Sequence, residues 1–230
     1  MNVFGLATGA NNTFVTVGKG HIKFWNLPVG NAVSGELPSK SGIYNKSIKD
    51  RTVIAACYLS ISSDVVSGMS DGSLLLWNDK TNSKFVKDAH KGPITALCVV
   101  SDSSSSSSAG GTGGASGSNA PSLVTGGSGA SSSSLFVSGG NDGIINIWYG
   151  NQLTKTWTCN IKTSTPVSVL PKISAISSRD NKIVVGTKGA EIYEIDRITN
   201  DMLCLVQGHF GGNNELWGLS PLHDTNQNNN

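Results

Sequence analysis

The pentapeptide GMSDG at 68–72 matches the G-x-S-x-G pattern that carries the nucleophile of many serine hydrolases. That chemistry needs the serine on a strained turn between a strand and a helix, with an acid and a histidine placed beside it. Here strand-like apolar sequence lies on both sides of the motif, VV at 65–66 and LLLW at 74–77. We therefore interpret the motif as a hairpin turn, and no hydrolase activity is expected.

Two other residue groups suggest chemistry, and both lack the required spacing. The glycine-rich stretch Gly110–Gly117 contains no Gly-Lys-Ser/Thr and opens no helix, so it does not predict a phosphate loop. The histidines are isolated in the sequence, with no H-x-H or H-E-x-x-H pattern, and they are His21, His90, His209 and His223. The sequence predicts no metal site, no cofactor and no enzyme. His21 is expected to point toward a sheet face or solvent.

The four cysteines do not form a recognisable ligand or disulfide pattern. They are Cys57, Cys98, Cys159 and Cys204, each pair more than forty positions apart and without a C-x-x-C motif. Each lies within an apolar strand-like run, so we expect small buried side chains with unreactive thiols. This usage is typical of a reducing compartment.

Composition excludes several classes of function. Of 230 residues, 28 are glycine, 37% are hydrophobic and 14% are charged, which is too apolar for a disordered chain and too interrupted for long helices. A net charge of +2 creates no global field for nucleic acid or acidic lipid. The longest apolar runs, such as Val53–Leu59, are far shorter than a membrane span, and no secretory signal opens the sequence. We expect a cytoplasmic protein with neither a nucleic-acid nor a membrane partner.

The chain repeats one pattern four times: an apolar strand, a glycine, a polar turn and a second apolar strand that contains an aromatic residue. The copies are VTVGKGHIKFWN (15–26), VVSGMSDGSLLLWN (65–78), FVSGGNDGIINIWY (136–149) and VVGTKGAEIYEID (184–196). Trp25, Trp77, Trp148 and Tyr193 are assigned to the aromatic position, at spacings of 52, 71 and 45 residues. Such self-similarity is typical of repeat architectures.

The long middle spacing has a cause that is visible in the composition. Residues 101–134 are almost entirely Ser, Gly, Ala and Thr, which is typical of a flexible loop. Removing this insertion brings the spacing close to the others. Within it, Ser122–Gly127 (SLVTGG) imitates the strand Leu135–Gly140 (LFVSGG), and we assign the strand to the later copy because a turn sequence follows it.

Further short strands complete each repeat. Those expected before the glycine-containing strands are Val53–Ser60, Ile94–Ser101, Lys172–Ser178 and Glu215–Pro221, and those after the aromatic are Lys84–Lys87, Lys155–Lys162 and Met202–Gln207. Units of four strands that repeat every 40–45 residues or so indicate a β-propeller. The predicted fold is all-β: a β-propeller of about four blades plus a stub, in an incomplete ring.

This reading also predicts the domain boundaries. Residues 1–225 form the partial propeller, with the Ser/Gly-rich insertion at about 101–134, and 226–230 form an Asn-rich low-complexity tail. Met1 is expected in the middle of a blade, and a fifth blade is expected to begin at Glu215. The open ends should expose strand edges and an apolar blade face.

The repeats resemble WD repeats, although their dipeptides read Trp25-Asn26, Trp77-Asn78 and Trp148-Tyr149. In the best-matching unit, four residues fall where that family places its buried His–Ser–Asp–Trp hydrogen-bond tetrad: His90, Ser138, Asp142 and Trp148. The preceding unit fills the pattern only at Ser67, Asp71 and Trp77 and lacks the opening histidine. By this resemblance the tetrad is structural, and the partner-binding residues are unknown.

A narrower resemblance covers nearly the whole chain outside the insertion and the Asn-rich tail. Four stretches look like echinoderm microtubule-associated protein-like proteins: VTVGKGHIKFWNL (15–27), KDAHKGPITALCV (87–99), KIVVGTKGAEIYEID (182–196) and GHFGGNNELWGLSP (208–221). The resemblance implies a non-enzymatic, cytoskeleton-associated scaffold whose propeller engages tubulin. The coiled coil, basic region and second propeller of that family are not in this sequence, which predicts a segment of a longer chain.

Alternatives stay open at this point. The missing blades come either from the rest of a longer chain or from self-association. A generic WD-repeat adaptor, such as a ubiquitin-ligase substrate receptor or a signalling scaffold, is the rival function. Six basic residues in the first part of the chain suit an acidic partner such as tubulin as well as they suit a solvated strand face. They are Lys19, Lys23, Lys40, Lys46, Lys49 and Arg51.

Overall fold

The computed structural model describes residues 2–28, 37–44, 52–59, 63–100, 134–163, 168 and 170–208. Within them, regular structure is almost entirely extended, apart from one 3-10 turn, η2, at Ile161–Thr163. The strands are β1 Val3–Thr8, β2 Thr13–Gly18, β3 His21–Asn26, β4 Ser39–Ser41, β5 Val53–Tyr58, β6 Val65–Met69, β7 Leu74–Asn78, β8 Thr81–Val86, β9 Ile94–Val99, β10 Leu135–Gly140, β11 Ile144–Tyr149, β12 Thr154–Asn160, β13 Ile173–Arg179, β14 Lys182–Thr187, β15 Glu191–Asp196 and β16 Met202–Gln207.

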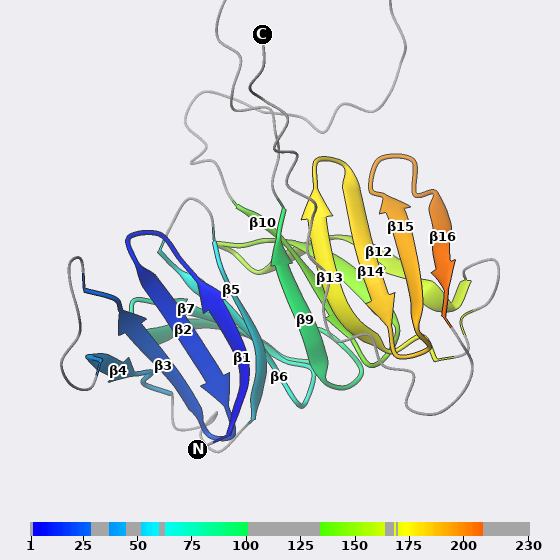
Figure 1. Cartoon of the computed structure of the whole chain (residues 1–230). Helices are drawn as coiled ribbons and strands as arrows, with labels where there is room; N and C mark the ends of the chain where they lie inside the picture. The colour runs from blue at the N-terminus through cyan, green and yellow to red at the C-terminus, as the bar shows by residue number, and fades with distance from the viewer. Residues whose placement is uncertain are drawn as a thin grey trace, which may run out of the picture.

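These strands form four antiparallel sheets of four strands each, and every sheet follows the order of the chain. Blade 1 is β1–β4, blade 2 is β5–β8, blade 3 is β9–β12 and blade 4 is β13–β16. The first strands of successive blades, β1, β5, β9 and β13, lie against one another, and the remaining strands spread outward from them (Figure 1). This arrangement confirms the predicted all-β fold of four propeller blades in an open ring.

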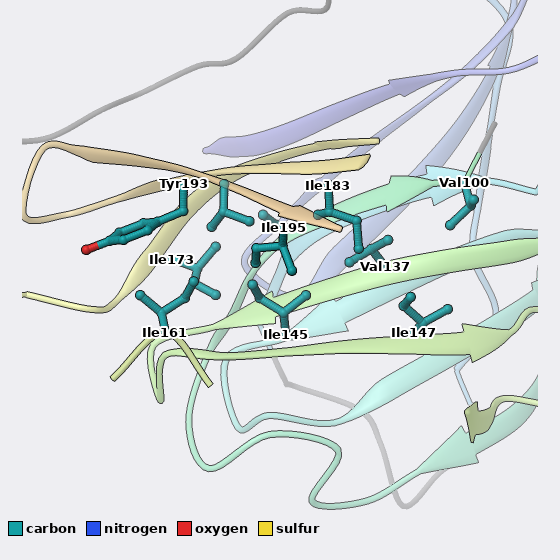
Figure 2. Packing of buried hydrophobic residues seen from close by; sticks show 11 residues of the cluster. Val100, Val137, Ile145, Ile147, Ile161, Ile173, Ile183, Tyr193 and Ile195 are labelled. Carbon is teal, nitrogen blue, oxygen red and sulfur yellow. The ribbon is translucent and has the colours of Figure 1, made fainter. Parts of the chain in front are cut away.

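Three apolar cores lie between neighbouring blades, because each blade is apolar on both faces and buries them against its neighbours. Blades 1 and 2 share the core that contains Val15, Val17, Ile22 and Trp77, and blades 2 and 3 share the core around Leu74, Leu76, Phe136 and Trp148. Blades 3 and 4 meet over a layer of mostly β-branched side chains (Figure 2). Stacking is therefore what stabilises each blade, as expected for repeat proteins.

The insertion separates two adjacent strands of blade 3 without disturbing their pairing. Val100 N donates to Leu135 O at 2.9 Å, and β10 pairs with β9 in an antiparallel ladder. The later of the two candidate strands, Leu135–Gly140, is thus confirmed. Its imitation at 122–127 lies outside the described residues.

One expectation about the start of the chain is wrong. Met1 was predicted to fall in the middle of a blade, yet β1 supplies the first strand of a blade with all four strands. Gly5 makes β1 difficult to recognise as a strand from the sequence, because glycine is unfavourable in strands. Glycine in a strand often marks a close approach of another backbone segment. A Cβ on Gly5 would lie 2.8 Å from the carbonyl oxygen of Ile54 in β5, so glycine is required where the two inner strands meet.

The aromatic position of the fourth repeat is also corrected. Trp148 pairs with Phe136 and Trp77 pairs with Val65, each two residues before the serine of its blade. In blade 4 the matching ladder position is Ile195, opposite Ile183, whereas Tyr193 lies opposite Val185. Tyr193 and Ile195 share one sheet face because side chains alternate with a period of two, so their apolar pattern alone did not separate them.

Apolar side chains remain exposed at both ends of the blade series. On β1, Phe4 is 52% exposed and Leu6 is 60% exposed, on the face turned away from blade 2. On β16, the outer strand of blade 4, Leu203 is 60% exposed. The predicted open apolar ends are therefore present. The stub expected from Glu215 lies outside the described residues.

Candidate functional site

The four residues predicted as a tetrad are brought together at one end of blade 3. Trp148 Nε1 donates to Ser138 Oγ at 2.8 Å, and His90 Nε2 lies 2.7 Å from the same oxygen. His90 Nδ1 lies 3.1 Å from Asp142 Oδ1. Because a carboxylate only accepts, we assign the proton to Nδ1, and Nε2 then accepts from the Ser138 hydroxyl.

Asp142 links its own hairpin to a segment that lies 51 to 52 residues earlier in the sequence. Its carboxylate accepts from His90, from the backbone N–H of Lys91 at 2.8 Å and from the N–H of Ile144 at 3.1 Å. Burial by itself would raise the pKa of Asp142, but these hydrogen bonds and the attraction of His90 together hold it below its ordinary value of 3.8. Gly143, at φ 75°, closes the turn beside it.

The tryptophan–hydroxyl bond recurs in two other blades. In blade 2, Trp77 Nε1 donates to Ser67 Oγ at 2.8 Å, and both residues are fully buried. In blade 1, Trp25 Nε1 donates to Thr16 Oγ1 at 2.9 Å. The turn of blade 2 also contains an aspartate in the position of Asp142, and the Asp71 carboxylate accepts a hydrogen bond from the Ser73 N–H at 3.0 Å. In each of these three blades the bond joins the second and third strands and satisfies the indole N–H.

Blade 4 replaces this arrangement with a buried carboxylate, which the sequence motifs did not predict. Glu191 is 5% exposed, and its Oε2 accepts hydrogen bonds from the hydroxyls of Ser168 and Thr187. Thr187 Oγ1 in turn accepts from the Gly189 and Glu191 amides. The Gly-Thr-Lys-Gly-Ala-Glu run at 186–191 was the available signal, but no local sequence pattern identifies Ser168 as its partner.

The other described residues that the sequence singled out lie in turns or strands of the blades. GMSDG forms the hairpin between β6 and β7, and the Ser70 N–H donates to Thr52 O at 2.9 Å. His21 is buried on a sheet face, with Nδ1 3.3 Å from Lys19 O. Burial raises the pKa of the Cys57 thiol, and all four cysteines are free. In the described ranges no cluster of three or more His, Cys, Asp or Glu residues forms a metal site.

Several hollows on the described surface are large enough to take a ligand group or a partner's side chain, and two of them lie beside the inner strands and the tetrad. The larger, about 710 Å³, lies where β1, β5 and β9 end and is lined by residues such as Leu6, Tyr58 and Leu97. The smaller, about 340 Å³, lies above His90 and Asp142 and has three lysines among its lining residues. Among the described elements no helix is long and apolar enough to cross a membrane.

Four sequential four-stranded blades with repeated tryptophan–hydroxyl bonds define a propeller segment of the WD-repeat type. The chain is a distant homologue of the echinoderm microtubule-associated proteins. It is 28% identical over 213 residues to the 77 kDa echinoderm microtubule-associated protein of Lytechinus variegatus, covering 92% of this chain and 25% of that protein. It is 29% identical over 211 residues to echinoderm microtubule-associated protein-like 1 of Rattus norvegicus, covering 91% of this chain and 20% of that protein.

The human echinoderm microtubule-associated protein-like 1 is 28% identical over 211 residues. The chain thus spans about a fifth to a quarter of the length of these curated relatives. No family model matches the sequence.

Proposed function

We propose that this chain is a non-enzymatic WD-repeat scaffold segment that binds tubulin or microtubules and is associated with the cytoskeleton. The observation that supports this proposal is the similarity to microtubule-associated proteins, which extends over more than nine-tenths of the chain. A relationship on that scale includes all four blades rather than one repeat.

The architecture suits such a role. The interblade cores hold the blades against one another, and the buried hydrogen-bond networks of blades 3 and 4 fix each blade internally, so that exposed loop residues are presented to a partner on a rigid support. Exposed Lys19 and Lys40, with Lys23 placed 5.7 Å from the Trp25 ring centroid, leave positive charge on blade 1. Lys46, Lys49 and Arg51 lie outside the described residues.

The proposal is tested by immunoprecipitating the endogenous protein with an antibody raised against this segment and probing the precipitate for tubulin and for ubiquitin-ligase subunits. Enrichment of tubulin without ligase subunits is the expected result. Ligase subunits without tubulin would instead identify the rival adaptor function.

A second test uses the purified 230-residue chain in co-sedimentation with assembled microtubules. The exposed apolar face of blade 1 is a source of unspecific adhesion, so the Phe4→Ser/Leu6→Ser double variant serves as the control. Specific binding is expected to survive in this variant. Loss of co-sedimentation in the control would show that adhesion by the open face explains the signal.

A further inference from the structure

Three lysines from separate elements surround the smaller hollow, of about 340 Å³, on blade 3. Lys91 comes from the connection between β8 and β9, Lys155 from β12 and Lys162 from η2. All three side chains belong to exposed residues, whereas His90, on the inner side of the hollow, is only 3% exposed. The hollow therefore combines an exposed rim of three lysines with a buried polar floor.

The polar side chains of the floor form hydrogen bonds with one another and with the backbone, so they are not available to bind a ligand. Asn146 Nδ2 donates to Ala89 O at 3.2 Å and contacts His90 Nε2 at 3.2 Å, while Thr158 Oγ1 donates to Asn146 Oδ1. The Asp142 carboxylate is already engaged by His90 and by two backbone amides. Hydrogen bonds within the floor fix its shape and leave recognition to the rim.

The rim carries an excess of positive charge. Lys91, Lys155 and Lys162 make no ion pair within the described part of the chain, in contrast to Lys182, whose Nζ lies 2.8 Å from Glu194 Oε1. Asp88 and Asp142 are the acidic residues that line the hollow, and the carboxylate of Asp142 is held by the tetrad. An acidic ligand would gain contacts to three ammonium groups that lack a carboxylate partner here.

We propose that this lysine-lined hollow is a docking site for a carboxylate-rich segment of a protein partner. Among the described residues, the lining holds lysines and no arginine, whereas recognition of phosphate groups commonly uses the bidentate fork of arginine. Lysines act as separate, flexible point charges, which suits several carboxylates spread along a peptide. The inference rests on the proposed function only in naming tubulin as the natural source of such a segment.

The test measures fluorescence anisotropy of a fluorescein-labelled octaglutamate peptide on the 230-residue chain. Exposed ion pairs contribute little one at a time, so two charges are reversed together, in Lys155→Glu/Lys162→Glu. The matched control is Lys19→Glu/Lys40→Glu, which makes the same change in net charge on blade 1. We expect the affinity to fall at least tenfold in the first variant and less than twofold in the control, and to fall in the wild type as salt is raised.

Equal losses in the two variants would overturn the inference, because binding would then follow net charge alone. Failure of the wild type to bind the peptide at low salt would also overturn it. Displacement of the peptide by inorganic phosphate at matched ionic strength, more strongly than by free glutamate, would reassign the hollow to phosphate. Unchanged circular dichroism and thermal midpoints show that both variants are folded.

A parallel tubulin-binding experiment distinguishes the docking site from the proposed function. Peptide binding that depends on Lys155 and Lys162, together with no precipitation of tubulin, supports the docking site and contradicts the proposed function. Tubulin binding that is unchanged in Lys155→Glu/Lys162→Glu supports the function and overturns this hollow as its contact.

Discussion

Ser168 donates a hydrogen bond of 2.9 Å to the carboxylate of Glu191, and this bond ties the segment before β13 to the hairpin between β14 and β15. In blade 3 the pair of His90 and Asp142 makes the same connection, from the segment before β9 to the hairpin between β10 and β11. Two different sets of side chains thus perform one structural task. The task itself, holding a blade's entry segment against its central hairpin, is what the fold requires.

Replacing Glu191 with Ala should destabilise the protein by roughly 1–3 kcal/mol, since the buried hydroxyls of Ser168 and Thr187 would lose their acceptor. The measurement is the free energy of unfolding in urea. Glu194→Ala is the matched control, because within the described residues the Glu194 carboxylate bonds only the exposed Lys182, and its loss should cost less than about 1 kcal/mol. Equal losses would contradict the buried network.

Replacing Trp148 with Ala should cost about 3–5 kcal/mol, because the ring fills the core between blades 2 and 3 and its indole N–H bonds Ser138. Trp25→Ala is the comparison. Trp25 makes the same hydrogen bond in blade 1, but its ring is only partly buried, so a smaller loss is expected. Urea titrations of the two variants give the difference, and a loss near zero for Trp148 would show that the repeat alignment is wrong.

Acid should weaken the protein through Asp142. The folded-state pKa of this carboxyl lies below its ordinary value of 3.8, so its contribution to stability is complete above that pH and is lost as the pH falls through the folded pKa. Thermal unfolding of the wild type and of Asp142→Asn between pH 6 and pH 2 is the measurement. The gap between the two proteins should narrow toward the acid end, and a constant gap would count against this assignment.

The open face of blade 1 should promote self-association. Phe4 and Leu6 are exposed on one face of β1, and replacing both with Ser removes most of the apolar surface of that strand face. Sedimentation velocity should show less high-mass material in this double variant. Ile198→Ser, which removes an equally exposed side chain from a turn, should change the profile little. If both variants behave alike, the blade face is not the cause.

Deleting 103–118 should change the free energy of unfolding by less than about 1 kcal/mol, because loop-closure entropy varies slowly with loop length. The ends of the insertion are held independently of its length, by Val100 N to Leu135 O and by Gly150 N to Ser134 O. Urea unfolding of the shortened chain is the measurement. A loss of several kcal/mol would mean that the insertion packs on the blades.

Features that depend on neighbours in the sequence were predictable. Trp148 and Ser138, like Trp77 and Ser67, are ten residues apart on adjacent strands of a hairpin, and the resemblance to WD repeats predicted that the first pair would be joined by a hydrogen bond. Blade count and all-β class follow from the same repeated hairpins. The local sequence pattern did not predict β1, because Gly5 is required there by the close approach of the Ile54 backbone in blade 2.

Features that join distant segments were decided by the tertiary structure. The choice between Tyr193 and Ile195 depends on ladder register, which the shared apolar face leaves open. The lysine hollow gathers Lys91, Lys155 and Lys162 from positions up to 71 residues apart, and Ser168 meets Glu191 across 23 residues of sequence. The sequence by itself determined the hairpins, because their pairing is local. The tertiary structure decided which distant side chains meet, because these contacts form only when the segment that precedes a blade and the later strands of that blade come together.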